Sequence, residues 1–142
     1  MKELKGYRVV KGEGSVNVIP SGSTLAINLP GLVVENGFDV PALGSLWFTS
    51  NDSPYEETLY ISLVDSQAVV IDHIELYKPY TPGLLKEVVA NGNNIQFKFW
   101  QALVHYLSVD REKHLRLSRL LPPAGCYYAS KLTPSYLTLS KI

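Results

Sequence analysis

The chain has 142 residues, 46% hydrophobic and 18% charged, and its 13 basic and 13 acidic side chains leave no formal net charge. This length suits a single domain spanning residues 1–142, and the hydrophobic fraction argues against disorder. The charged fraction is below the roughly 25% typical of globular domains. Because interface cores are depleted in charge, this composition favours a homo-oligomer or a large protein interface.

The charges are unevenly spread along the chain. Residues 1–80 hold five basic and ten acidic side chains, a net of −5, and residues 81–142 hold eight and three, a net of +5. Two acidic residues, Asp110 and Glu112, interrupt the strongest basic cluster, which consists of Arg111, Lys113, Arg116 and Arg119. Nucleic-acid binding calls for an uninterrupted basic face with interleaved aromatics, so we expect no nucleic-acid partner.

The sequence carries no sign of secretion or membrane insertion. One cysteine, Cys126, excludes an intrachain disulfide, and its apolar surroundings predict a buried structural thiol. No apolar stretch follows the basic residues of the first six positions, so we expect no signal peptide and synthesis in the cytoplasm. No segment approaches the roughly 18 apolar residues of a membrane span, so we expect no membrane partner.

Short β-branched and aromatic segments, separated by Gly, Pro, Asn and Ser, occupy the first half of the chain. This rhythm, with strands at about 8–12-residue spacing, is typical of an antiparallel β-sandwich or small barrel. We therefore predict a mainly β, jelly-roll-like domain with at most one or two short helices. The expected strands are residues 7–11, 16–19, 24–28, 32–35, 45–49, 58–64 and 68–77.

Turns are expected between these strands, and two of them fix the course of the chain. Asn36-Gly37 is the strongest short turn signal in the chain, and Pro41 makes residues 38–43 an edge strand or a connection. Asp65-Ser66-Gln67 predicts a hairpin. On its second arm, alternation gives a core-facing set that consists of Val70, Ile74 and Leu76.

The middle of the chain allows two interpretations. Thr81-Pro82 could start a helix that Asn91-Gly92 closes, and a strand fits residues 81–91 about as well. Residues 95–109 are so apolar that periodicity does not separate helix from strand. We expect a strand to about residue 100 and leave the rest open. Further strands are expected at residues 114–120, 127–132 and 136–142.

Catalytic motifs are weak. No G-x-S-x-G elbow occurs, and the paired acids Glu56-Glu57 suit a solvated strand entry. His73 and Glu75 share one face of a strand, and with His105 or His114 they could form the two-histidine, one-carboxylate site of a small cupin-like metalloenzyme. All three histidines are isolated in the sequence. We therefore expect no enzyme, metal or cofactor.

Aromatic residues are the most suggestive group, with nine Tyr and two Trp. Tyrosine is amphipathic and suits contact surfaces for proteins or sugars. The expected ligand or partner contacts are Trp47, Tyr77, Lys78, Tyr80, Arg116 and Arg119. The favoured function is a non-enzymatic structural protein that associates with itself or with other structural proteins, as in a virion (phage) or an appendage. The alternatives are a carbohydrate-binding module using Tyr77, Tyr80 or Trp47 and the metalloenzyme above.

Overall fold

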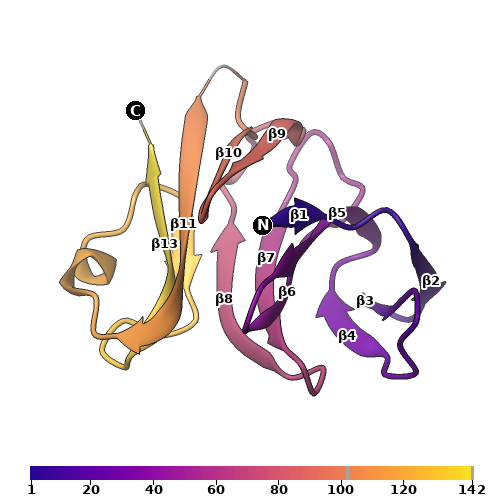
Figure 1. Ribbon diagram of the computed structural model, residues 1–142. Coiled ribbons are helices and arrows are strands. Elements are labelled where there is room, and N and C mark those ends of the chain that lie inside the picture. Colours follow the sequence, from indigo (N-terminus) through magenta and orange to yellow (C-terminus); the bar gives the residue numbers. More distant parts are fainter. Residues whose placement is uncertain (102, 142) are drawn as a thin grey trace.

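A six-stranded antiparallel sheet forms the middle of the molecule (Figure 1). The computed structural model describes residues 1–101 and 103–141 of the chain. Four strands of this central sheet follow one another along the chain as hairpins, and β1 and β12 are added at its two edges. In spatial order the strands are β1 (Lys2–Glu3), β5 (Val33–Val40), β6 (Gly44–Ser50), β7 (Leu59–Asp65), β8 (Val70–Leu76) and β12 (Cys126–Tyr128).

Two smaller antiparallel sheets cover the central one from opposite sides (Figure 1). The four-stranded sheet has the order β13 (Ser135–Lys141), β11 (Val104–His114), β10 (Asn94–Lys98) and β9 (Lys86–Asn91). The three-stranded sheet has the order β2 (Tyr7–Lys11), β3 (Ser15–Pro20) and β4 (Ile27–Pro30). The single short helix among the described residues is the 3₁₀ helix η1 (Leu117–Leu120).

Strand alternation on β6 explains how one sheet serves two cores. Leu46 and Phe48 point into the larger core, shared with the four-stranded sheet, and Trp47 points into the smaller core, shared with the three-stranded sheet. The ring of Phe48 meets Phe97 of β10 edge to face at 5.4 Å between centroids. On the other side, the ring of Trp47 meets that of Tyr7 at 5.1 Å. The expected mainly β, sandwich-type fold is confirmed, with a third sheet added to it.

The hairpin expected at Asp65-Ser66-Gln67 is confirmed, and the strong turn expected at Asn36-Gly37 is wrong. Both Asn36 and Gly37 lie inside β5 and pair with β6. A Cβ at Gly37 would overlap the ring of Trp47. The glycine therefore makes room for the tryptophan in the smaller core, and it does not provide the positive φ of a turn.

Residues 81–91 form a loop and a strand, and the helical alternative is wrong. The backbone N–H groups of Gly83 and Leu84 donate to the carbonyl oxygens of Pro54 and Phe99, at 3.1 and 2.9 Å, which holds the loop in an extended course. After β9, Gly92 takes a φ of +61° in the turn to β10. Asn91-Gly92 is therefore a hairpin turn and not a helix end.

The strand expected over residues 114–120 is also wrong. β11 ends at His114, and η1 follows. His114 still pairs with Ser135 of β13. Beyond it, side chains attach the segment to β13: Arg116 Nε donates to the Ser135 carbonyl at 3.3 Å, and Arg119 Nε donates to the Leu137 carbonyl at 3.1 Å. Of the strand expected at 127–132, only the beginning forms, as β12.

Candidate functional site

The structure places the six residues expected at a site in three different environments. Trp47 is fully buried, and its Nε1 donates to Ser45 Oγ at 2.7 Å, so it offers no ring face to a ligand. Arg119 is fully buried as well. Arg116 lies near the surface with its Nη2 3.2 Å from Asp110 Oδ2. The remaining three, Tyr77, Lys78 and Tyr80, are neighbours in the connection after β8.

Glu56 organises that connection. The Tyr77 hydroxyl donates to Glu56 Oε1, and the Tyr80 backbone N–H donates to Oε2 at 3.0 Å. The Tyr77 hydrogen bond lowers the pKa of the Glu56 carboxyl and raises the pKa of the Tyr77 phenol. The Lys78 ammonium lies over the Trp100 ring, 4.3 Å from its centroid. The Tyr80 side chain is almost fully exposed, at 88%.

A first candidate surface surrounds η1, the coiled ribbon at the left of Figure 1. Four leucines within seven residues are between 44% and 88% exposed there. Because a 3₁₀ helix has three residues per turn, Leu117 and Leu120 share one side of η1. Soluble proteins rarely leave contiguous apolar surface uncovered unless it binds something. The leucine surface is defined by Leu115, Leu117, Leu120 and Leu121.

A buried ion pair fixes the leucine surface to the body of the protein. Arg119 Nη2 lies 2.5 Å from Asp72 Oδ2 of β8. Arg119 also donates from Nη1 to the Ser130 carbonyl at 2.8 Å and from Nη2 to the Leu137 carbonyl at 2.7 Å. Its guanidinium lies 4.4 Å from the centroid of the Tyr128 ring. Arg119 therefore anchors the segment that carries the exposed leucines to β8 and β13.

A second candidate surface is the part of the central sheet that the three-stranded sheet leaves uncovered. Tyr60 on β7 is directly opposite Glu75 on β8, which is directly opposite Tyr127 on β12. Tyr77 follows Glu75 by two residues. A cavity of about 370 Å³ is lined by Thr58, Glu75, Tyr77 and Tyr127. We call the set Thr58, Tyr60, Glu75, Tyr77 and Tyr127 the tyrosine face.

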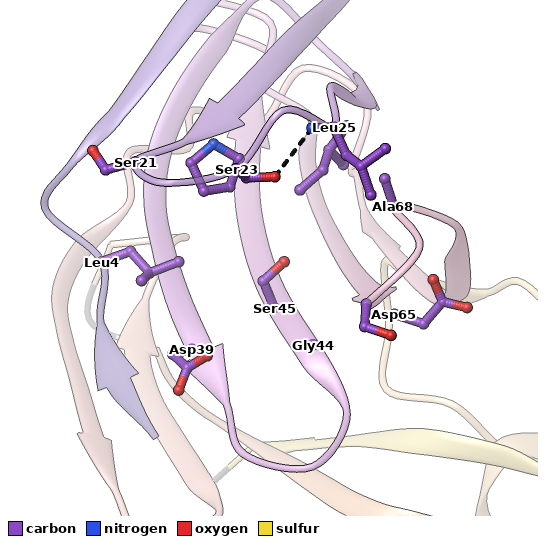
Figure 2. A pocket seen from close by; sticks show the side chains of 12 residues that line it. Leu4, Ser21, Ser23, Leu25, Asp39, Gly44, Ser45, Asp65 and Ala68 are labelled. Carbon is purple, nitrogen blue, oxygen red and sulfur yellow. Dashed lines mark hydrogen bonds between the residues drawn. The ribbon is translucent and has the colours of Figure 1, made fainter.

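Figure 2 shows a second hollow, which lies between the three-stranded and central sheets. Its volume is about 280 Å³. Three of its polar side chains already accept hydrogen bonds within the protein. Ser23 Oγ accepts from the Leu25 N–H at 3.1 Å, Ser45 Oγ accepts from Trp47, and Asp65 Oδ1 accepts from two backbone N–H groups of its own hairpin. This crevice follows from the packing of two layers and carries no functional assignment.

The histidines do not form the metal site that the sequence allowed. His73 lies on the tyrosine-face side of β8, where its ring stacks on Tyr60 at 6.1 Å. His105 is buried and stacks on Phe97 at 5.2 Å, and His114 is exposed beside Asp110. Within residues 1–101 and 103–141, no group of three His, Cys, Asp or Glu side chains could hold a metal ion.

The sequence pointed to Tyr77 and its neighbours and considered Glu75 only as a metal ligand beside His73, but it did not single out Tyr60 and Tyr127 as site residues. The signal was present as alternation, since Tyr60, Glu75 and Tyr77 all occupy the non-core phase of their segments. The alternation pattern did not reveal the pairing of β12 with β8, which brings together residues about 50 positions apart.

In the described parts of the chain, no helix has the length and apolarity needed to cross a membrane. Searches with protein-family models, against curated proteins and against solved structures find no match to this chain.

Proposed function

We propose that this protein is a non-enzymatic structural protein that assembles with copies of itself, as a component of a virion (phage) or of an appendage. The observation that carries the proposal is the leucine surface. Leu121 is 88% exposed and Leu117 is 69% exposed, and a folded protein gains free energy by covering such side chains, at about 25 cal/mol per Å² of apolar area.

Two further features support assembly. The leucine surface is held by the buried Asp72–Arg119 pair, so little conformational entropy is lost when a partner docks on it. The chain is also poor in charge, at 18%, and interface cores are depleted in charged residues. Most homo-oligomers close around a symmetry axis, so one surface can meet its own copy.

Light scattering coupled to size exclusion, over a wide range of protein concentrations, tests the proposal. We expect masses that are multiples of the 15.8 kDa chain, and we expect Leu117→Glu to shift the population to the monomer. The matched control is Leu84→Glu, because Leu84 is 58% exposed but lies in the loop before β9. A wild-type monomer at every concentration, or equal effects of both variants, would overturn the proposal.

A further inference from the structure

The tyrosine face has the geometry of a small-ligand site. Tyr60, Glu75 and Tyr127 are cross-strand neighbours in one row, and adjacent strands are about 4.8 Å apart. Glu75 therefore has a tyrosine on each neighbouring strand of this row, Tyr60 on β7 and Tyr127 on β12. The adjoining cavity, about 370 Å³, falls at the lower end of the roughly 300–1,000 Å³ range of ligand pockets.

The supporting residues hold this face in place. Buried Glu57 accepts hydrogen bonds from the backbone N–H groups of Asn51 and Ser53 at 2.7 and 2.9 Å, which fixes the loop before β7. From that loop, Asn51 Nδ2 donates to the Tyr60 hydroxyl at 3.0 Å. On the other side of the cavity, Tyr77 is tied to Glu56. A ligand would meet a largely preformed surface.

The polar atoms of the face have unused hydrogen-bonding capacity. The Glu75 carboxylate accepts no hydrogen bond from any described residue, although the side chain is half-buried. The Tyr60 hydroxyl accepts from Asn51 and so keeps its proton for donation. Tyr127 is 54% exposed and its hydroxyl is likewise without a described partner. The cavity thus offers the Glu75 carboxylate as a strong acceptor, the Tyr127 hydroxyl as a donor and an aromatic surface, and the Tyr60 hydroxyl is a second donor in the same row of the sheet.

This combination distinguishes between ligand classes. An anion would be repelled by Glu75. A cation would pair with Glu75 and lie on a ring, but it offers no acceptor to the phenol hydroxyls, which would stay hydrated and add nothing to binding. A saccharide offers hydroxyls that donate to a carboxylate and accept from a phenol, and its C–H face packs on an aromatic ring. We propose that the tyrosine face binds a neutral saccharide, with Glu75 accepting from sugar hydroxyls and Tyr127 as the stacking ring.

This site differs from the sugar platform suggested by the sequence, because Trp47 is buried in the smaller core. The proposed saccharide site is also separate from the proposed assembly surface, because the leucine surface and the tyrosine face share no residue. The two proposals can therefore fail separately, and the binding test is run on both the wild-type chain and the Leu117→Glu variant.

The test is a ¹H–¹⁵N NMR titration of the full chain with glucose, galactose, mannose and N-acetylglucosamine, and with their β-linked oligomers. We expect chemical-shift changes at Tyr60, Glu75, Tyr77 and Tyr127. Isosteric Glu75→Gln and Tyr127→Ala are each expected to weaken binding at least tenfold. The control Tyr106→Ala, which truncates a half-buried tyrosine of β11, is expected to bind as the wild type does.

Three results would overturn the proposal: no shift with any saccharide, shifts confined to the crevice of Figure 2, or binding of N-acetylarginine amide at the tyrosine face in place of the sugars. Because Glu75→Gln keeps the shape of the side chain, it separates loss of binding from loss of folding. Thermal unfolding of each variant verifies that the variant is folded.

Discussion

Arg119 and Asp72 are 47 residues apart in the chain and form an ion pair with both side chains buried, Nη2 to Oδ2 at 2.5 Å. Asp72 Oδ2 also accepts from the backbone N–H groups of Tyr136 and Leu137, at 3.0 and 2.8 Å. The pair thereby joins β8 of the central sheet, β13 of the four-stranded sheet and η1. A buried charge of either sign is costly alone, so each residue depends on the other.

Removing one partner of this pair should therefore destabilise the protein strongly. We expect Arg119→Met and Asp72→Asn each to lower the free energy of unfolding by about 3–5 kcal/mol, because the remaining group is left buried without its counter-charge. Urea unfolding measures this. The control is Arg116→Met, which removes the more exposed pair with Asp110 and one hydrogen bond to the Ser135 carbonyl and should cost less, about 1–2 kcal/mol. Equal costs for Arg116→Met and Arg119→Met would contradict the assignment.

Gly37→Ala should destabilise the smaller core. Its new Cβ would overlap the Trp47 ring, and overpacking of this kind costs about 1–3 kcal/mol. Chemical denaturation should show this loss, and adding Trp47→Phe should reduce the penalty of the Gly37→Ala change by making room. The control, Gly12→Ala, places its Cβ in ordinary contact with Ser15 and should leave stability unchanged or slightly higher. A Gly37→Ala protein as stable as the wild type would show that Trp47 can move aside.

The sequence predicted the mainly β fold correctly because alternation and turn residues are local properties. It failed where a glycine or an arginine acts through a distant residue. In the sequence, Gly37 resembles a turn residue. The structure shows that a glycine is needed at this position because the Trp47 ring lies where a Cβ would be. Likewise, residues 114–120 alternate as a strand does, but Arg119 reaches Asp72 and the Leu137 carbonyl, and this tertiary contact outweighs the local pattern.

Of the candidate sites, the sequence indicated one end of the tyrosine face, through Tyr77. Tyr60 and Glu75 face each other across the expected hairpin, but Tyr127 becomes a neighbour of Glu75 only through the pairing of β12 with β8, and register between distant strands is not encoded in any short window. The sequence pattern around Asp72 already indicated a buried partner for its carboxylate. Asp72 shares the core-facing phase of β8 with Ile74 and Leu76, and a carboxylate at such a position requires a buried partner.

His73 should make stability depend on pH. Burial lowers its pKa below the ordinary 6.5, although the nearby Glu75 and Asp72 carboxylates partly oppose the shift. Below pH 6.5 the unfolded chain therefore binds a proton at this residue that the folded protein does not, and stability falls as the pH falls toward the lowered value. We expect His73→Gln to lose less stability than the wild type over this interval in urea unfolding. If the free energies of unfolding of the two proteins changed equally with pH, the lowered pKa of His73 would be contradicted.

Cys126 should be inert in the folded protein. The thiol is buried in the larger core, and burial raises its pKa to about 11, so almost no reactive thiolate exists at mildly alkaline pH. We expect an aromatic disulfide reagent to label the native protein slowly and the urea-unfolded protein at once, with one equivalent per chain, because the sequence has one cysteine. Cys126→Ala controls for background reaction.

The same reaction links Cys126 to the buried ion pair. Arg119 covers the ring of Tyr128, which lies on β12 with Cys126, and slow labelling of a buried thiol follows transient opening of the structure. Arg119→Met should therefore accelerate native-state labelling of Cys126, whereas Arg116→Met should change the rate much less. Rapid labelling of the wild-type protein in native buffer, or an unchanged rate in Arg119→Met, would show that β12 opens independently of the Asp72–Arg119 pair.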